Sequence, residues 1–149
     1  MPLSLRERAL RYLAQRDHSR AELIRKLASH GEEEEISQVL ARLDELGLLS
    51  DTRFAESFVR SRANRLGNGR LRQDLARKGV DRDTIELALA GEHCQGSELE
   101  RAWEIRARKF GEPPTNGREW ARQARFLQGR GFATDIIRKV LKDWNDEPA

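Results

Sequence analysis

Few residues in this chain have the types and spacing that catalysis or metal binding requires. His18, His30 and His93 are isolated in the sequence, without an H-x₃-H or E-x-x-H spacing, so we expect no metal site. Cys94 is the only cysteine, which excludes an intramolecular disulfide. It follows His93 directly, and adjacent residues on a helix do not face each other. We therefore do not expect a thiol nucleophile with an oriented base.

Phosphate-binding and base-stacking motifs are also weak. The chain has no P-loop, and Gly67-Asn68-Gly69 lacks the preceding strand and third glycine of a dinucleotide loop, so it is better interpreted as a turn between helices. Trp103, Trp120 and Trp144 each lie on an apolar helical stripe, so we expect core anchors rather than stacking platforms for bases. The sequence thus predicts a binding protein without catalytic residues or a cofactor.

The composition predicts narrow apolar stripes and wide polar faces. The chain has 149 residues, of which 38% are hydrophobic and 36% charged; globular domains are usually richer in the first and poorer in the second. An elongated helical array satisfies this balance. The sequence has no apolar signal region at its start and no apolar run as long as a membrane span, so the default expectation is a cytoplasmic protein without a membrane partner.

Capping residues and glycines divide the chain into helices. Four capping boxes are predicted: Ser4/Glu7, Ser19/Glu22, Ser97/Glu100 and Asn116/Glu119. Left-handed glycines are expected at the helix ends: Gly31, Gly47, Gly67, Gly79, Gly91, Gly111 and Gly129 or Gly131. The apolar residues between these marks follow a helical period, and no segment alternates with period two. We therefore predict an all-α fold of nine helices: 4–16, 19–30, 32–46, 51–66, 69–78, 82–90, 98–110, 117–128 and 134–144.

The nine helices form three similar groups. The pattern Leu23, Leu27, Gly31, Ile36 and Leu40 recurs as Leu71, Leu75, Gly79, Ile85 and Leu89, and again as Leu127, Gly131, Ile137 and Leu141. A spacing close to 50 residues is typical of a short helical repeat. We predict three tandem three-helix units, 1–49, 50–96 and 97–149, that resemble helix-turn-helix or homeodomain units and form a curved array.

Basic charge is concentrated in the second and third units. Segment 53–78 has eight basic residues against two acidic ones, and segment 101–130 has eight against three. By contrast, the first unit carries the acidic block 32–35, which favours helix initiation. Helical projection turns Phe54, Phe58, Leu71 and Leu75 inward and many arginines outward. Arg62 lies near the buried edge of its helix, where an ion pair and a solvated position are equally plausible.

We interpret the outward cations as an electrostatic footprint for nucleic acid or for an acidic protein groove. The predicted basic face consists of Arg53, Arg60, Arg65, Arg70, Arg72, Arg77, Lys78, Arg108, Lys109, Arg118, Arg122, Arg125 and Arg130.

One run of residues resembles a known family. The middle of the chain is similar to the hallmark of the bacterial RecX regulators. The matching residues are Leu49-Ser50-Asp51, Arg53-Phe54-Ala55, Phe58-Val59 and Arg62, followed by the segment from Gly67 to Gly79 with Arg70, Leu71, Asp74, Leu75 and Lys78. Segments 16–27, 108–113 and 125–132 are similar to that family too, so the resemblance covers nearly the whole chain in order. Asp74 departs from the pattern, which usually has Glu there.

The resemblance implies a modulator of the RecA recombinase. RecX proteins are built from three-helix motifs, bind the RecA–DNA filament along its groove, and inhibit its ATPase, strand exchange and coprotease activities. They also bind single- and double-stranded DNA without sequence specificity and are not enzymes. We expect the same of this chain, acting as a monomer.

Two other functions are possible. A sequence-specific helix-turn-helix protein would read bases with a helix N-terminus, but the third helices here begin with acidic residues at 32–35, Asp81, Asp83 and Asp135, which would repel phosphate. The other alternative is a small hydrolase or thiol enzyme, of which the thiol version would depend on Cys94.

Overall fold

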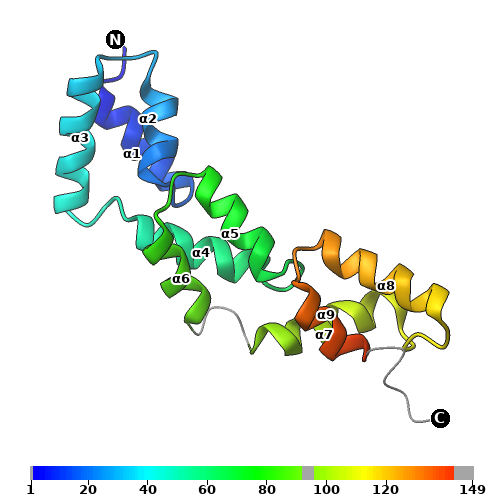
Figure 1. The fold of residues 1–149 in the computed structure, drawn as a ribbon. Helices are drawn as coiled ribbons and strands as arrows, with labels where there is room; N and C mark the ends of the chain where they lie inside the picture. The colour runs from blue at the N-terminus through cyan, green and yellow to red at the C-terminus, as the bar shows by residue number, and fades with distance from the viewer. Residues whose placement is uncertain (1, 92–95, 143–149) are drawn as a thin grey trace. The chain divides into compact units, whose positions relative to one another are not determined.

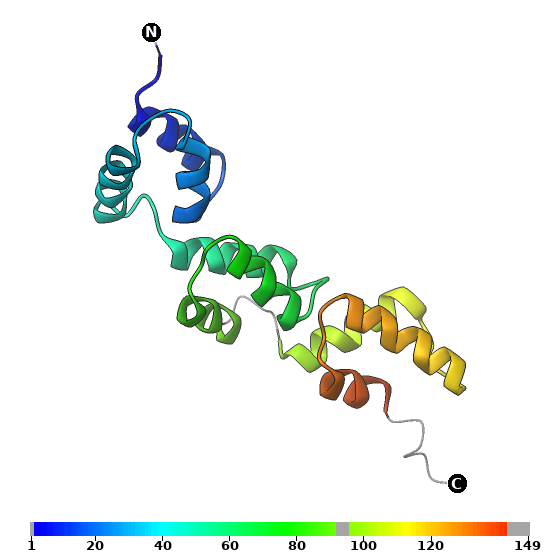
Figure 2. The same ribbon diagram turned by 45° about the horizontal axis from the view of Figure 1, so that its top comes forward.

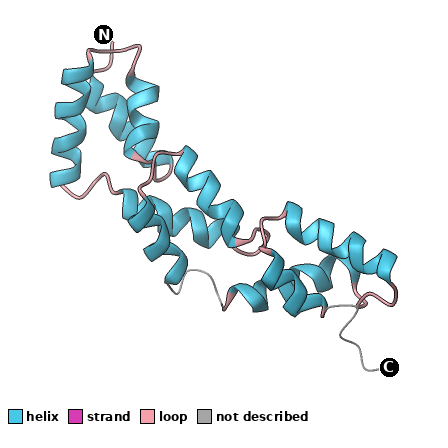
Figure 3. Ribbon diagram, viewed as in Figure 1, coloured by secondary structure: helices cyan, strands magenta, loops and turns pink. Residues whose placement is uncertain are grey.

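The computed structural model describes residues 2–91 and 96–142, and nine helices and no strands lie within them (Figures 1 and 3). The helices are α1 (Leu5–Gln15), α2 (Arg20–Leu27), α3 (Glu33–Glu45), α4 (Asp51–Arg62), α5 (Asn68–Arg77), α6 (Arg82–Ala90), α7 (Glu98–Phe110), α8 (Gly117–Gly129) and α9 (Thr134–Leu141). The predicted all-α fold is confirmed. Among the described residues, none of the helices combines the length and apolarity needed to cross a membrane.

The four predicted N-caps form, but only one makes the full reciprocal box. The side chains of Ser4, Ser19, Ser97 and Asn116 each accept a hydrogen bond from the backbone N–H three residues on. The return bond from the Glu carboxylate to the cap N–H forms at Ser19. Before α8, the carboxylate of Glu119 accepts instead from Thr115, so that it orders the incoming loop rather than closing the box.

Helix α4 ends at Arg62, earlier than the predicted span 51–66. The carbonyls of Ala63 and Leu66 accept hydrogen bonds from the guanidinium of Arg101 at 3.0 and 2.7 Å. This side chain from α7 satisfies carbonyl groups that would otherwise face the end of a helix without partners. The predicted end of the last helix at 144 lies outside the described residues.

The predicted left-handed glycines are confirmed at Gly47, Gly79, Gly111 and Gly131, whose φ angles are positive. The prediction was wrong for Gly31 and Gly67, where φ is not left-handed, and of the alternatives Gly129 and Gly131 the structure selects Gly131. At Gly67 the reason for glycine is space, because a Cβ there would lie 2.6 Å from the backbone of Gly131.

The chain divides into two compact bodies. The N-terminal body comprises 1–58 and 75–88, and the C-terminal body comprises 59–74 and 89–149. In the N-terminal body α1, α2 and α3 pack together around buried Leu23, Leu27, Leu40 and Leu43 (Figure 1).

In the C-terminal body, α7, α8 and α9 enclose a second core (Figure 2). Its buried apolar residues are Ala102, Ile105, Leu127, Phe132, Ile137 and Leu141. Thus the predicted inward positions of α8 and α9 do form a core, and the same helical stripe organises the first and last groups of helices.

Within the N-terminal body, the start of α2 is held by Asp51 of α4 and by Lys78 and Gly79, which follow the end of α5. The hydroxyl of Ser19 donates to the carbonyl of Lys78 at 2.6 Å. The backbone N–H of Arg20, the first residue of α2, donates to the carboxylate of Asp51, the first residue of α4, at 2.8 Å. Gly79 fits against this helix start with a φ of +82°.

The C-terminal body repeats this arrangement at the start of α5. The N–H of Gly67 donates to the carbonyl of Arg130 at 2.7 Å. The N–H of Asn68, the first residue of α5, donates to the carboxylate of Glu98, the first residue of α7, at 2.8 Å. Gly131, with a φ of +96°, occupies the place of the earlier glycine. We call these two sets of contacts the first and second helix-start junctions.

Candidate functional site

All thirteen residues of the predicted basic face reach solvent. Eleven are exposed, and Lys78 and Arg130 are half-buried. They divide between the two bodies: Arg53, Arg77 and Lys78 belong to the N-terminal body and the others to the C-terminal body. The predicted inward positions Phe54, Phe58, Leu71 and Leu75 are all buried, as helical projection requires.

In the C-terminal body three of the cations gather around an aromatic pair. The rings of Phe110 and Phe126 meet edge to face, with centroids 5.4 Å apart. The guanidinium of Arg122 lies 5.5 Å from the Phe110 ring centre, and Lys109 and Arg130 lie 5.7 and 5.0 Å from that of Phe126. Cation–π attraction therefore positions charges that repel one another. We call these five residues the Phe110–Phe126 cluster.

Helix α8 presents a row of arginines. Arg118, Arg122 and Arg125 stand at i, i+4 and i+7, on one side of the helix, and all three are exposed. Within the described residues, the side chains of Arg118 and Arg125 form no hydrogen bond or ion pair. Two unpaired guanidinium groups on one helical face can bind the oxygens of a phosphate or carboxylate from outside.

Two of the three basic-face cations of the N-terminal body, Arg53 and Lys78, form ion pairs within it. Arg53 forms an ion pair with Asp17 at 3.3 Å, and the ammonium of Lys78 lies 3.4 Å from the carboxylate of Glu22. Glu22 is buried and also binds Arg16 at 3.0 Å. Arg53 and Lys78 thus help to hold the second group of helices against the first.

Two arginines in the basic segment 101–130 are buried, which the sequence did not reveal. Arg101 and Arg106 are only 4% and 3% exposed. Arg101 binds the end of α4, as described above, and Arg106 donates to the carbonyl of Glu112 at 3.1 Å. The surface charge of this segment is therefore lower than its composition suggests. The one available signal was their position, because both share a helical face with Ala102 and Ile105.

The predicted tryptophan anchors differ from one another. Trp103 is 55% exposed, so the prediction that it lies in the core was wrong. Helix α7 turns Ala102 and Ile105 inward, which leaves Trp103 on the outer side with the guanidinium of Arg106 5.7 Å from its ring centre. Trp120 does pack against the core of the C-terminal body and donates to the carbonyl of Lys142. Trp144 lies outside the described residues.

Other side chains that could do chemistry are dispersed. Among residues 2–91 and 96–142, no three His, Cys, Asp or Glu side chains come together as metal ligands. His93 and Cys94 lie outside the described residues. Arg62 is half-buried and its guanidinium donates to the hydroxyl of Ser61 at 3.0 Å.

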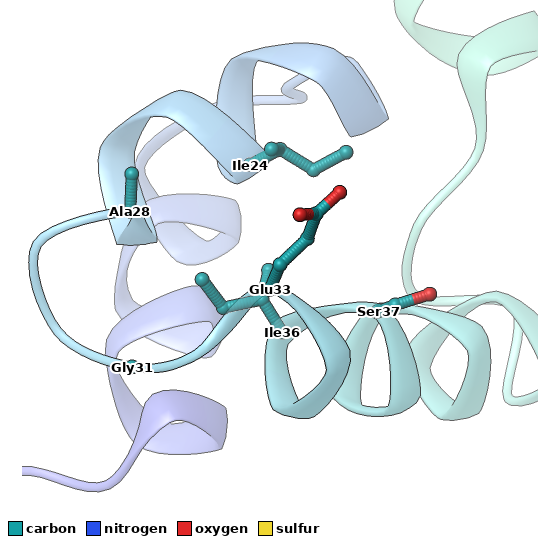
Figure 4. Close-up of a pocket in the computed structure, with 6 residues that line it drawn as sticks. All are labelled: Ile24, Ala28, Gly31, Glu33, Ile36 and Ser37. Atoms are coloured by element: carbon teal, nitrogen blue, oxygen red, sulfur yellow. The ribbon is translucent and has the colours of Figure 1, made fainter.

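A pocket of about 340 Å³ lies between α2 and α3 (Figure 4). It is lined by Ile24, Ala28, Gly31, Glu33, Ile36 and Ser37. Its floor is apolar, and Glu33 is the one charged residue among those that line it. No member of the basic face contributes to this pocket, so it is separate from the candidate surface.

The fold and the surface define a class of protein: an all-α protein of repeated three-helix units whose exposed arginines suit an anionic partner. Family models match residues 6–43, 50–89 and 97–141 as the first, second and third three-helix domains of RecX.

Individual relatives extend this match over the whole chain. The "Regulatory protein RecX" of Leptothrix cholodnii is 51% identical over 94% of this chain and 88% of its own length. The "Regulatory protein RecX" of Ralstonia nicotianae is 43% identical over 99% of this chain and 96% of its own length. The crystal structure of RecX from Lactobacillus salivarius superposes with a TM-score of 0.77 at 26% identity, over 95% of this chain and 94% of that one. The chain belongs to the RecX family of regulatory proteins.

Proposed function

We propose that this protein binds the RecA–single-stranded DNA filament and inhibits the ATPase, strand-exchange and coprotease activities of RecA. Family membership supports the regulatory role. The observation that carries the binding role is the exposed row Arg118, Arg122 and Arg125 on α8. Like charges at i,i+4 destabilise an isolated helix by about 0.2–0.5 kcal/mol per pair, a cost that an external anion would offset.

In the proposed mechanism, the three-helix units lie in the filament groove across neighbouring RecA subunits. The arginines of α8 and the Phe110–Phe126 cluster meet acidic RecA surface and the phosphates of the bound strand. Occupation of the groove blocks the entry of duplex DNA and hinders the subunit movement that ATP turnover requires. The protein acts by occupancy and performs no chemical step. As a cytoplasmic monomer it also binds free single- and double-stranded DNA without requiring a defined sequence.

The alternative, a helix-turn-helix protein that reads duplex DNA directly, has less support. Asp81 directly precedes α6, and hydrogen bonds from Thr84 lower its pKa, so this helix start carries a negative charge. Helix α3 has three glutamates in its first turn, after Glu32 at its N-cap, and α9 has Asp135 in its first turn. Acidic groups at these helix starts oppose insertion between phosphates.

Charge reversal on α8 tests the proposal. We expect Arg118→Glu/Arg125→Glu to bind RecA–DNA filaments at least tenfold more weakly, and its DNA affinity to depend less steeply on salt, by about one unit of slope per lost phosphate contact. Neither side chain has a hydrogen-bond or ion-pair partner among residues 2–91 and 96–142, so the variant should melt at the wild-type temperature.

The matched control is Arg6→Glu/Arg11→Glu, which makes the same change in charge at two exposed positions of α1. We expect this variant to bind filaments as the wild type does. Wild-type filament binding by a folded Arg118→Glu/Arg125→Glu protein, or equal losses in both variants, would contradict a role for the α8 surface.

A further inference from the structure

Gln123 is a polar residue at a core position of the repeat. Leu127, Gly131 and Ile137 follow Leu75, Gly79 and Ile85 by 52 residues, and the same offset aligns Gln123 with Leu71. Leu71 is completely buried, as is Leu23 at the corresponding position of the first unit. Gln123 is equally enclosed, with 4% of its surface exposed. An amide thus replaces the leucine that the other two units place here.

Of the two polar atoms of this amide, only Nε2 has a hydrogen-bond partner among the described residues. Its Nε2 donates to the carbonyl of Glu112 at 3.2 Å. Because a carbonyl only accepts, this bond fixes the orientation of the amide and leaves Oε1 as the second polar atom. Oε1 is buried and has no hydrogen-bond partner in the described part of the chain. A buried acceptor without a donor is destabilising, and leucine would remove that cost.

Gln123 lines a pocket of about 240 Å³ beneath the loop that joins α7 to α8. The other lining residues are Phe110, Glu112, Pro113, Thr115, Glu119 and Arg122. Phe110 and Pro113 provide flat apolar surfaces, and the exposed Arg122 provides a positive charge at the same place. Glu119 accepts two hydrogen bonds from Thr115, at 2.8 and 2.9 Å, and therefore holds the loop.

We infer that this pocket receives an amino-bearing nucleobase of single-stranded nucleic acid, whose exocyclic N–H donates to Oε1 of Gln123 once the loop between α7 and α8 has shifted to expose this buried atom. The base packs on Phe110 and Pro113, and its phosphates lie along Arg118 and Arg122 of α8. Cytosine and adenine carry an exocyclic amino donor on the edge that pairs with a partner strand, where thymine carries a carbonyl acceptor. The inference rests on the proposed function, because it requires the nucleic-acid strand that the α8 arginines bind.

The test compares two labelled oligomers of equal length, oligo(5-methyl-dC) and oligo(dT), by fluorescence anisotropy with the full chain. Their bases have the same ring and methyl group and differ at position 4, where one has an amino group and the other a carbonyl, and at the neighbouring N3. We expect the affinity of the wild type for the amino-bearing oligomer to be about fivefold higher. This ratio corresponds to one hydrogen bond that contributes about 1 kcal/mol.

Gln123→Leu should abolish this preference. It should leave the affinity for oligo(dT) and its salt dependence unchanged, because α8 keeps its arginines. The variant should unfold at the same or a higher temperature, since leucine occupies the equivalent position twice in this chain. The matched control, Gln128→Leu, makes the same substitution at an exposed position of the same helix and should retain the preference.

Three results would overturn the inference. The first is equal wild-type affinity for the two oligomers, or a preference that survives Gln123→Leu. The second is an equal loss of affinity for both oligomers in Gln123→Leu, which would show that the amide only holds the loop between α7 and α8 in place. The third is weaker binding of that variant to RecA without any change on the oligomers, which would make a protein segment the occupant. The charge-reversal experiment on α8 is independent of all three, so the proposed function can stand when this inference fails.

Discussion

Glu22 shows how a single buried carboxylate holds the first helix-start junction. Burial raises its pKa, but the hydrogen bonds from Arg16 and from the N–H of Ser19, with the charges of Arg16 and Lys78, outweigh this effect and lower the pKa from 4.5 to about 2. The same side chain therefore closes the capping box of α2 and binds a lysine from beyond α5.

Because of this lowered pKa, the free energy of unfolding depends on pH in the acidic range. A carboxyl with a lowered pKa in the folded state stabilises the fold fully above its unfolded value. We therefore expect the free energy of unfolding to fall as pH drops from 4.5 towards 2, by about 3 kcal/mol at most for this group. Urea unfolding of wild type and Glu22→Gln across this range measures the effect, and the variant should lack this part of the decrease.

The control is Glu45→Gln, which removes the exposed partner of Arg42 and should leave the wild-type pH profile almost unchanged. An identical acid profile for Glu22→Gln and wild type would show that Glu22 does not carry the linkage.

Residue type and helical position predicted the exposed arginines of α8 because charged side chains that leave the apolar stripe reach solvent. They did not predict Arg101, since its burial depends on carbonyls of the α4–α5 turn that only the folded chain brings close. The prediction for Trp103 was wrong for the opposite reason. Its hydrophobicity suggested the core, but Ala102 and Ile105 define the buried side of α7.

At the scale of the elements, two glycines allow the second helix-start junction to form. A Cβ on Gly131 would lie 2.3 Å from the Cβ of Arg70, and one on Gly67 would lie 2.6 Å from the backbone of Gly131. The positive φ of Gly131 adds a second constraint that side chains rarely meet. Backbone therefore contacts backbone at this junction, which allows the amide–carbonyl hydrogen bonds from Gly67 to Arg130 at 2.7 Å and from Gly69 to Gly131 at 3.0 Å.

Gly131→Ala should therefore destabilise the protein by more than about 2 kcal/mol, because it combines backbone strain with an overlap that separates the junction. Thermal or urea unfolding provides the measurement. Gly117→Ala is the matched control: a Cβ there meets nothing within 4 Å, and alanine favours the helix, so its stability should be unchanged or slightly higher. Equal stabilities for the two variants would refute the close-packing account.

Helix positions were predictable because capping residues and the apolar period act locally. The predicted starts at Ser4, Ser19, Ser97 and Asn116 are all N-caps in the structure. The junctions were not predictable, since Asp51 and Glu98 bind backbone groups about 30 residues earlier in the chain and no local pattern marks such partners.

At the scale of the whole molecule, one three-helix plan serves different purposes in successive units. The first unit has a continuous leucine-rich core and an acidic helix start. The third has exposed arginines on α8, the Phe110–Phe126 cluster and a buried amide in place of leucine. The repeat thus supplies the scaffold, and the substitutions on it supply the surface that we propose for binding. The predicted unit boundaries, 1–49, 50–96 and 97–149, stay a prediction.

The central claim is that this protein regulates RecA by occupying its filament. The most direct measurement is the ATPase rate of RecA on single-stranded DNA, titrated with the wild-type protein at two salt concentrations. We predict inhibition that saturates as the filament fills and that requires more protein at the higher salt concentration, because arginine contacts to anions weaken with screening. An ATPase rate that stays constant throughout the titration at low salt would contradict the account.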